Sequence, residues 1–353
     1  MLDSHEGRTM SSSVTSAPAF TPVVLPARVV APPATISPEA AAALSIGAGI
    51  PPVARPLPQD LEGWRRAIET NRSMWEPIAS EMLANSRCSV ETRDIAGVRT
   101  HVCTPAKADR GGSAARSPQG STSTAGRCRY LYIHGGAFVF GAGRFAMATG
   151  ARACDALDLV TVSVDYRMPP DHPFPAALED CLAVYQGLLQ DAPEQKIVIG
   201  GSSAGGNLAA SLTLLIRDRG LPAPAAVVLL TPEVDLTESG DTFRTNELLD
   251  VTLKRGLPEC NALYAAGRDL RDPYLSPLFA DFARGFAPTF IQSGTRDLFL
   301  SNSALMHRKL RRAGVDAELH VWEAMPHGGF GFGSVPENDE INAEIRQFIA
   351  RHC

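Results

Sequence analysis

The residues best suited to chemistry lie in a glycine-rich turn at 201–205, which reads Gly-Ser-Ser-Ala-Gly and fits the pattern G-x-S-x-G. The turn stands between an apolar run at 197–199 and a helix-compatible run. In this context the middle serine sits on a tight strand-to-helix turn, and the N-terminus of the helix directs backbone N–H groups at an oxyanion. The pattern therefore predicts Ser203 as a nucleophile, with Ser202 as a supporting residue and Ala204 as an oxyanion donor.

A second glycine-rich segment, His134-Gly135-Gly136-Ala137, follows an apolar run at 130–133. Glycine lets the backbone approach a carbonyl oxygen without interference from a side chain. Where such a segment accompanies a nucleophilic serine, its N–H groups complete an oxyanion hole. We therefore predict oxyanion donors at the two glycines and at Ala137, and we expect His134 to brace the loop instead of acting as the base.

A serine on such a turn needs a base and an acid, and in the chain the acid comes first, then the histidine. Four histidines follow Ser203, and only His327 lies in a small-residue loop just after an expected strand. The acid is expected in the loop after the preceding strand, 289–292, and this predicts Asp297 as the acid. Taken singly, each residue could be a turn cap or a solvated loop side chain. The prediction of a triad therefore depends on the three residues together, because each of them lies just after an expected strand.

Strands that end at one edge of a sheet must position these residues, and the sequence predicts such strands. Short apolar runs alternate with helical patterns, which is typical of a mostly parallel sheet with helices on both faces. With a hairpin before them, the runs predict an α/β fold with an eight-stranded sheet. The expected strands are 89–94, 98–102, 130–133, 160–164, 197–199, 226–230, 289–292 and 318–321, and the expected helices are 144–156, 175–190, 204–218, 301–313 and 337–351.

Two further segments accompany a catalytic domain expected at 87–353. Residues 1–58 are rich in Pro and Ala and hold ten of the 27 prolines. This composition predicts a partly disordered arm without regular elements. Residues 59–86 have apolar side chains at near-helical spacing, which predicts one or two cap helices with a break at Pro77. Within the catalytic domain, an insertion at about 232–286 interrupts the alternation and is expected to complete the cap.

Composition narrows the class of protein. The net charge of −5 and the lack of a dense basic run disfavour a nucleic-acid partner. No apolar stretch reaches about 18 residues, so stable membrane insertion is not expected. Seven scattered cysteines without a C-x-x-C pair predict neither a disulfide framework nor a zinc site and favour the cytoplasm. Residues 105–127 lack large apolar side chains and predict a flexible loop.

Several motifs, in the same order, resemble the hormone-sensitive-lipase-like esterases. This group is also called bacterial family IV or the α/β-hydrolase fold-3 group. The resemblance runs from about Ser89 to the C-terminus and departs at Ser202, where the family usually has an acid, and at Ala137, where a third glycine is common. A backbone N–H survives either change. The motifs are HGGA at 134–137, DYRMPPDHPFPAA at 165–177, GSSAGG at 201–206, DPYLSP at 272–277 and the segments around Asp297 and His327.

The resemblance implies a serine carboxylesterase that hydrolyses short- to medium-chain esters through an acyl-enzyme, without a metal or an organic cofactor. Hydrolysis of lactones, amides or aryl-acyl compounds on the same site is the alternative, and a non-catalytic small-molecule receptor of the same fold is a remote one. The expected partner is a small-molecule ester or lactone. The natural substrate, and whether the chain pairs as a homodimer, stay open.

Overall fold

The computed structural model describes residues 23, 26–106 and 128–353. Residues 32–353 form one compact unit, and residues 1–31 are grouped apart from it. Residues 107–127, which are most of the predicted flexible loop, therefore lie outside the described residues. Residues 1–22, 24 and 25 of the predicted arm lie outside them too.

An eight-stranded sheet runs through the compact unit in the order β1-β2-β4-β3-β5-β6-β7-β8. The pairs β1–β2 and β2–β4 are antiparallel, and the other neighbours are parallel. The predicted eight-stranded, mostly parallel sheet is thus confirmed. The strands are β1 Ser89–Ile95, β2 Val98–Thr104, β3 Cys128–Ile133, β4 Thr161–Val164, β5 Lys196–Ser202, β6 Ala226–Leu230, β7 Thr289–Gly294 and β8 Ala317–Trp322.

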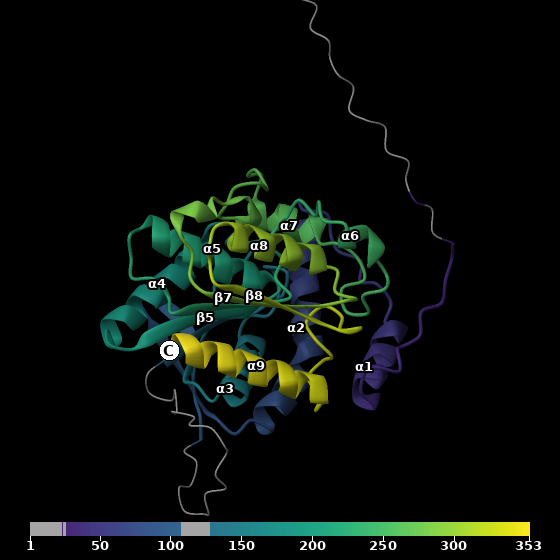
Figure 1. The fold of residues 1–353 in the computed structure, drawn as a ribbon. Helices are drawn as coiled ribbons and strands as arrows, with labels where there is room; N and C mark the ends of the chain where they lie inside the picture. The colour runs from purple at the N-terminus through teal and green to yellow at the C-terminus, as the bar shows by residue number, and fades with distance from the viewer. Residues whose placement is uncertain (1–22, 24–25, 107–127) are drawn as a thin grey trace, which may run out of the picture. The chain divides into compact units, whose positions relative to one another are not determined.

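Helices cover both faces of this sheet, with α3 and α9 on one side and α4, α5 and α8 on the other (Figure 1). Central strands are therefore buried on both sides, as in β7, where all six residues are buried. Each of these helices begins and ends within one residue of its predicted range. They are α3 Arg144–Leu157, α4 Ala176–Asp191, α5 Ala204–Asp218, α8 Leu300–Arg312 and α9 Pro336–His352.

Helix α2 spans Leu61–Ala84 without interruption, so the predicted break at Pro77 is wrong. Proline inside a helix removes one backbone hydrogen bond. Here the helix packs along α3 and buries Trp64 completely, and we attribute its continuity to this packing. The indole N–H of Trp64 donates to the Leu57 carbonyl at 3.0 Å, which fixes the chain just before the helix.

A helix also forms within the predicted arm, where no regular element was expected. Helix α1 covers Pro38–Gly49, and the Ser37 hydroxyl caps it by accepting from the Ala40 N–H. Its first residue is a proline, which is well tolerated at that position because the N–H there has no helical partner. The Ser37 backbone N–H and hydroxyl both donate to the carboxylate of Glu337 at 2.7 Å, which ties α1 to the start of α9.

A disulfide between Cys128 and Cys353 is a further correction, since paired cysteines were not expected. The two residues are 225 positions apart, and their Cα atoms lie 6.2 Å from each other. Their pairing depends on β3 starting where α9 ends, which no spacing in the sequence indicates. Because disulfides persist in oxidising environments, this pair removes part of the basis for the predicted cytoplasmic location.

The insertion between β6 and β7 carries short helices: α6 Thr242–Thr245, α7 Pro258–Ala265, and the 3₁₀ turns η1 Pro277–Phe279 and η2 Phe282–Arg284. Its apolar side chains pack with α2 and with the segments that follow β3 and β7. We call this group the cap cluster. Its buried members are Trp64, Ala137, Val139, Phe243, Leu253, Leu257, Cys260, Leu263, Leu298 and Phe299.

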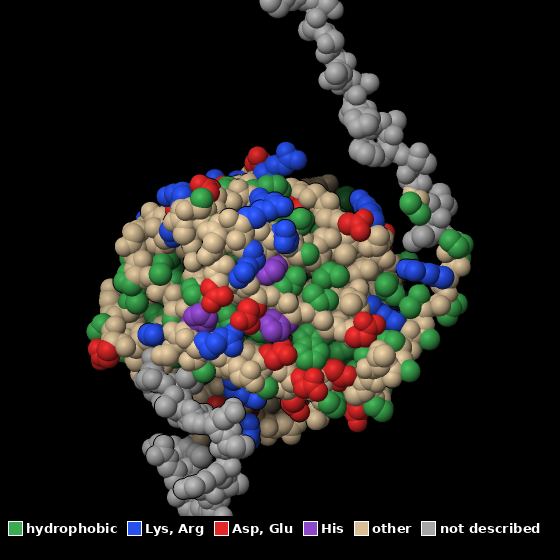
Figure 2. All heavy atoms as spheres, in the orientation of Figure 1, with side chains coloured by type: hydrophobic (Ala, Val, Ile, Leu, Met, Phe, Trp, Pro, Cys, Tyr) green, Lys and Arg blue, Asp and Glu red, His purple; other side chains and the backbone are tan. Residues whose placement is uncertain are grey.

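The surface over α8 and α9 mixes charges of both signs (Figure 2). Arg351 pairs there with Glu318, and His320 lies 2.7 Å from the Glu344 carboxylate. This face therefore shows no broad basic patch of the kind that binds nucleic acid. In the part of the chain that is described, no helix combines the length and apolarity that crossing a membrane requires.

Candidate active site

Ser203 occupies the turn between β5 and α5, with φ of 59° and ψ of −121°. A residue with a side chain rarely adopts such a backbone conformation, so the turn is strained. Gly205 allows it, because a Cβ there would lie 2.0 Å from the Ile133 carbonyl oxygen. The Ser203 N–H donates to the Leu230 carbonyl at 2.9 Å. Ser202 ends β5 and is half-buried, so of the two adjacent serines only Ser203 stands at the apex.

The glycines of the second predicted segment lie beside this turn. A Cβ on Gly135 would be 3.3 Å from Ser203 Cβ, and one on Gly136 would be 2.1 Å from the Phe140 carbonyl oxygen. Gly136 also has a φ of 122°, which favours glycine. Ala204 is the first residue of α5, where backbone N–H groups have no partner within the helix. Backbone from both segments thus flanks the serine, as an oxyanion hole requires.

His134 lies inside the protein, next to these glycines. Its Nδ1 is 2.7 Å from the Gly135 carbonyl oxygen, and its ring stacks on Tyr166 at 4.2 Å. The Tyr166 hydroxyl donates to the His134 carbonyl at 2.9 Å. Burial lowers the pKa of His134 to about 4, so the ring is neutral near pH 7. These contacts support its predicted role as a brace for the segment that ends at Ala137.

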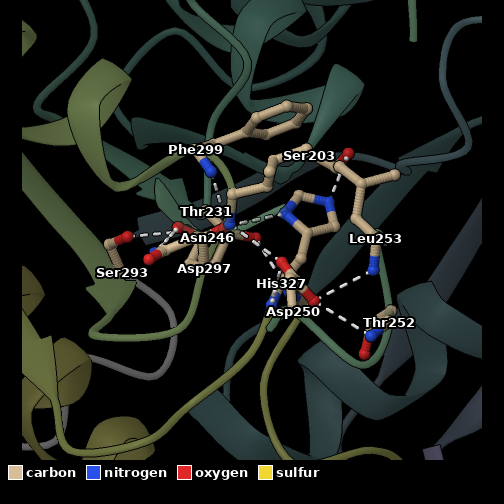
Figure 3. Close-up of polar contacts among 12 residues, drawn as sticks. Ser203, Thr231, Asn246, Asp250, Thr252, Leu253, Ser293, Asp297, Phe299 and His327 are labelled. Atoms are coloured by element: carbon tan, nitrogen blue, oxygen red, sulfur yellow. Dashed lines mark hydrogen bonds and ion pairs between the residues drawn. The ribbon is translucent and has the colours of Figure 1, made fainter. Parts of the chain in front are cut away.

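The structure brings the three predicted triad residues together at the carboxyl ends of β5, β7 and β8. Figure 3 shows the His327 ring between the other two side chains. The Ser203 hydroxyl lies 2.9 Å from Nε2, and the Asp297 carboxylate lies 3.1 Å from Nδ1. Ser203 and His327 are 9% and 8% exposed, so both residues are largely buried.

Two further donors hold the Asp297 carboxylate, which is completely buried. The Ser293 hydroxyl donates to Oδ2 at 2.6 Å, and the Phe299 N–H donates to Oδ1 at 2.9 Å. Hydrogen bonds to an ionised carboxylate are stronger than those between neutral groups. They keep Oδ1 aimed at the His327 ring.

The electrostatics of His327 combine two opposing effects. Burial of the ring disfavours its protonation, but the hydrogen bond and the negative charge of Asp297 outweigh burial, with Asp250 acting in the same direction. The pKa of His327 therefore lies above its ordinary value of 6.5. A ring of this kind accepts a proton readily when a neighbouring hydroxyl gives one up.

Sequence reasoning missed two residues of the insertion that reach this site. The Asn246 amide donates to the carbonyls of Thr295 and Asp297, at 3.2 Å and 2.9 Å. The Asp250 carboxylate accepts from the His327 N–H at 3.1 Å. Both lie in a segment without a recognisable motif, so only the folded chain reveals these contacts.

The sequence profile of the α/β-hydrolase fold matches residues 130–331, a range that includes every residue of this site. The chain belongs to the α/β-hydrolase fold family. An acetyl-hydrolase of Streptomyces hygroscopicus is 31% identical over 225 residues, which cover 60% of this chain and 75% of the relative. An esterase of Acinetobacter venetianus is 30% identical over 222 residues, which cover 62% of this chain and 73% of the relative.

Solved structures agree with this assignment. A crystal structure of an esterase, 32% identical, superposes with a TM-score of 0.80 over 94% of this chain and 99% of its own. Another, from the bacterial hormone-sensitive lipase family, is 27% identical, with a TM-score of 0.73 over 90% of this chain and 98% of its own. The predicted resemblance is confirmed, and this α/β-hydrolase is a carboxylic ester hydrolase. The alternative of a non-catalytic receptor is wrong.

Proposed function

We propose that this hydrolase is a serine carboxylesterase that acts on short- to medium-chain esters through Ser203, His327 and Asp297 and an acyl-enzyme. The position of His327 carries the proposal: one ring nitrogen lies 2.9 Å from the serine hydroxyl and the other 3.1 Å from the aspartate. An imidazole held between a hydroxyl and a buried carboxylate is suited to activating a nucleophile.

In the first step, the Ser203 oxygen attacks the ester carbonyl carbon while its proton passes to His327 Nε2. The carbonyl oxygen becomes an oxyanion, and we propose that the N–H groups of Gly135, Gly136, Ala137 and Ala204 donate to it. Losing one such donor typically costs about 3–4 kcal/mol of transition-state stabilisation. Small residues at these positions let the oxyanion come close.

In the second step, the tetrahedral intermediate collapses and His327 gives its proton to the departing alcohol. Ser203 is then esterified by the acyl group. Water attacks the acyl carbon while its proton passes to His327. The second tetrahedral intermediate then collapses as His327 returns this proton to the Ser203 oxygen, which releases the acid and restores the hydroxyl. Through both steps Asp297 holds the proton on Nδ1, so that Nε2 stays free to accept and donate. None of these steps requires a metal or an organic cofactor.

We expect kcat/KM to fall on the acid side with a midpoint above pH 6.5. The base must be neutral, and the pKa of His327 is raised, so protonation removes the base at a higher pH than for an ordinary histidine. The measurement is a pH–rate profile with p-nitrophenyl butyrate from pH 5 to 9. A flat profile, with hydrolysis shown to limit the rate, would contradict this account.

The cap cluster sets the surroundings of the acyl chain. It contains Phe299, whose ring meets the His327 ring edge-on with centroids 4.7 Å apart, and the oxyanion-segment residue Ala137. Trp64 is part of the same cluster and is completely buried. A separate cavity of about 310 Å³ lies between α2 and residues 139–145, and its lining includes none of the triad. Because the cap cluster around Phe299 is apolar, we propose that α2 and the insertion form a cap over an apolar acyl site.

The outer side of α2 also bears on substrate size. It carries exposed ion pairs, Arg65 with Glu62 and Arg72 with Glu69, in which both signs alternate. A lid that enters a lipid surface would present a broad apolar or basic face instead. This pattern favours dissolved short-chain esters over aggregated long-chain lipid.

We expect kcat/KM to rise with acyl length to about six or eight carbons and then to drop. Each enclosed methylene contributes about 0.8 kcal/mol, or about fourfold, only while the pocket can hold it. The measurement is kcat/KM for p-nitrophenyl acetate, butyrate, hexanoate, octanoate, laurate and palmitate, beside emulsified triolein. A maximum at palmitate, or activation by the triolein surface, would identify a true lipase.

Lactone hydrolysis uses the same atoms, with the leaving alcohol tethered to the acyl group, and amide hydrolysis uses a poorer leaving group. A γ- or δ-lactone series and an anilide in the same assay separate these substrates from open-chain esters. Homodimer formation and the cytoplasmic location stay predictions.

A further inference from the structure

Asp250 belongs to the insertion between β6 and β7, yet its carboxylate is completely buried against the triad (Figure 3). Oδ1 accepts from the N–H groups of Thr252 and Leu253, each at 2.9 Å. Oδ2 accepts from the Leu298 N–H at 2.8 Å and from the His327 N–H at 3.1 Å. All four donors are backbone groups, so this side chain binds local backbone instead of contacting a substrate.

The two donors to Oδ2 come from different loops. Leu298 directly follows Asp297 in the loop after β7, and His327 lies in the loop after β8. Asp250 Oδ2 therefore links the loop that carries the acid to the backbone of the base. Because a buried carboxylate that loses its donors pays a large desolvation penalty, this link resists separation of the two loops.

Asp250 also acts on the imidazole by its charge. Among the described residues, His327 contacts the Ser203 hydroxyl, the Phe299 ring, and the carboxylates of Asp297 and Asp250. Burial raises the pKa of Asp250 to about 6, so the group is largely ionised at neutral pH. The two negative charges both raise the pKa of His327, with Asp297 as the stronger influence.

We propose that Asp250 is a positioning residue of the triad, which fixes the His327 backbone against the Asp297 loop and helps to stabilise the imidazolium formed when Ser203 attacks. This proposal rests on the proposed triad mechanism. It assigns to the insertion a direct part in holding the base, in addition to any part in enclosing the substrate.

The test compares Asp250→Asn with the matched variant Asn246→Ala. Asn246 holds the same acid loop from the same segment, but its amide is uncharged. For Asp250→Asn we expect kcat to fall about 10- to 100-fold, with KM within about threefold. The acid limb is the part of the pH profile in which kcat/KM falls as His327 is protonated. We also expect the midpoint of this limb to move to a lower pH, by roughly half a pH unit, because His327 loses a negative neighbour. For Asn246→Ala we expect a lower kcat with the acid limb unmoved.

The proposal is overturned if Asp250→Asn keeps the wild-type kcat and the wild-type acid limb. It is also overturned if both variants lose activity while the midpoint of the acid limb stays unchanged, because that result would mean a structural role only.

Thermal unfolding shows whether Asp250→Asn is folded. If it is not, Asp250→Glu replaces it, since this variant keeps the charge but displaces the oxygens. We then expect a lowered kcat with the acid limb in place, and a wild-type kcat would contradict positioning. Ser203→Ala is measured in the same series. If it loses esterase activity, the triad mechanism is supported even where the Asp250 proposal fails.

Discussion

Replacing Ser203 by alanine is expected to lower kcat for p-nitrophenyl butyrate by about 10⁵- to 10⁶-fold, a loss of the size seen when a serine nucleophile is removed. The hydroxyl at the apex of the β5–α5 turn is the group that His327 Nε2 contacts at 2.9 Å. Alanine keeps the Cβ and the backbone geometry, so the fold should persist. The measurement is steady-state hydrolysis, with circular dichroism to verify folding.

The neighbouring serine provides the control. Ser202→Ala changes the same type of side chain one position earlier, at the end of β5, and we expect it to lose no more than about tenfold. If folded Ser203→Ala turned over the ester at a rate close to wild type while Ser202→Ala did not, the assignment of the nucleophile would be wrong.

Asp297→Asn is expected to lower kcat by about 10³- to 10⁴-fold with little change in KM. An asparagine amide facing Nδ1 disfavours the tautomer that leaves Nε2 free, and it cannot stabilise the imidazolium. With its NH2 group facing Nδ1, the side chain no longer accepts from the Phe299 N–H, but its carbonyl oxygen still accepts from the Ser293 hydroxyl, so we expect the ester to bind as before. The measurement is a kcat and KM pair at a pH above the acid limb.

A matched Asp→Asn change at the surface separates this effect from a general loss of charge. Asp191 is more than half exposed and pairs with Arg129 at 2.6 Å, at the far end of α4. Asp191→Asn should leave kcat within about twofold. Wild-type kcat in Asp297→Asn would exclude this residue as the acid of the triad.

The sheet and the residues at its strand ends could be predicted because they depend on local patterns. Apolar runs of three to five residues alternating with helical periodicity located β3 to β8, and a glycine-rich turn after β5 located Ser203. His327 and Asp297 followed from the order of strands, since parallel strands end at one edge. Each inference needed only neighbouring residues and a rule of topology.

The missed features depend on partners far apart in the sequence. Asp250 and Asn246 reach the triad only once the insertion has folded over β7 and β8. Cys128 meets Cys353 only because the start of β3 lies at the end of α9. Helix α1 forms although its segment is rich in proline, because Pro38 stands where a helix tolerates it and Glu337 of α9 binds the residue before it. These contacts leave no periodic signal in the chain.

Covalent labelling tests the central claim most directly, because it identifies the nucleophile by a bond. A fluorophosphonate reacts with a serine that a neighbouring histidine has activated, and mass spectrometry of the digested protein locates the adduct. We predict one adduct per chain, on Ser203, formed in parallel with loss of esterase activity and absent from Ser203→Ala. An adduct on Ser202 or another residue, or complete labelling of Ser203 with full activity retained, would contradict the proposed mechanism.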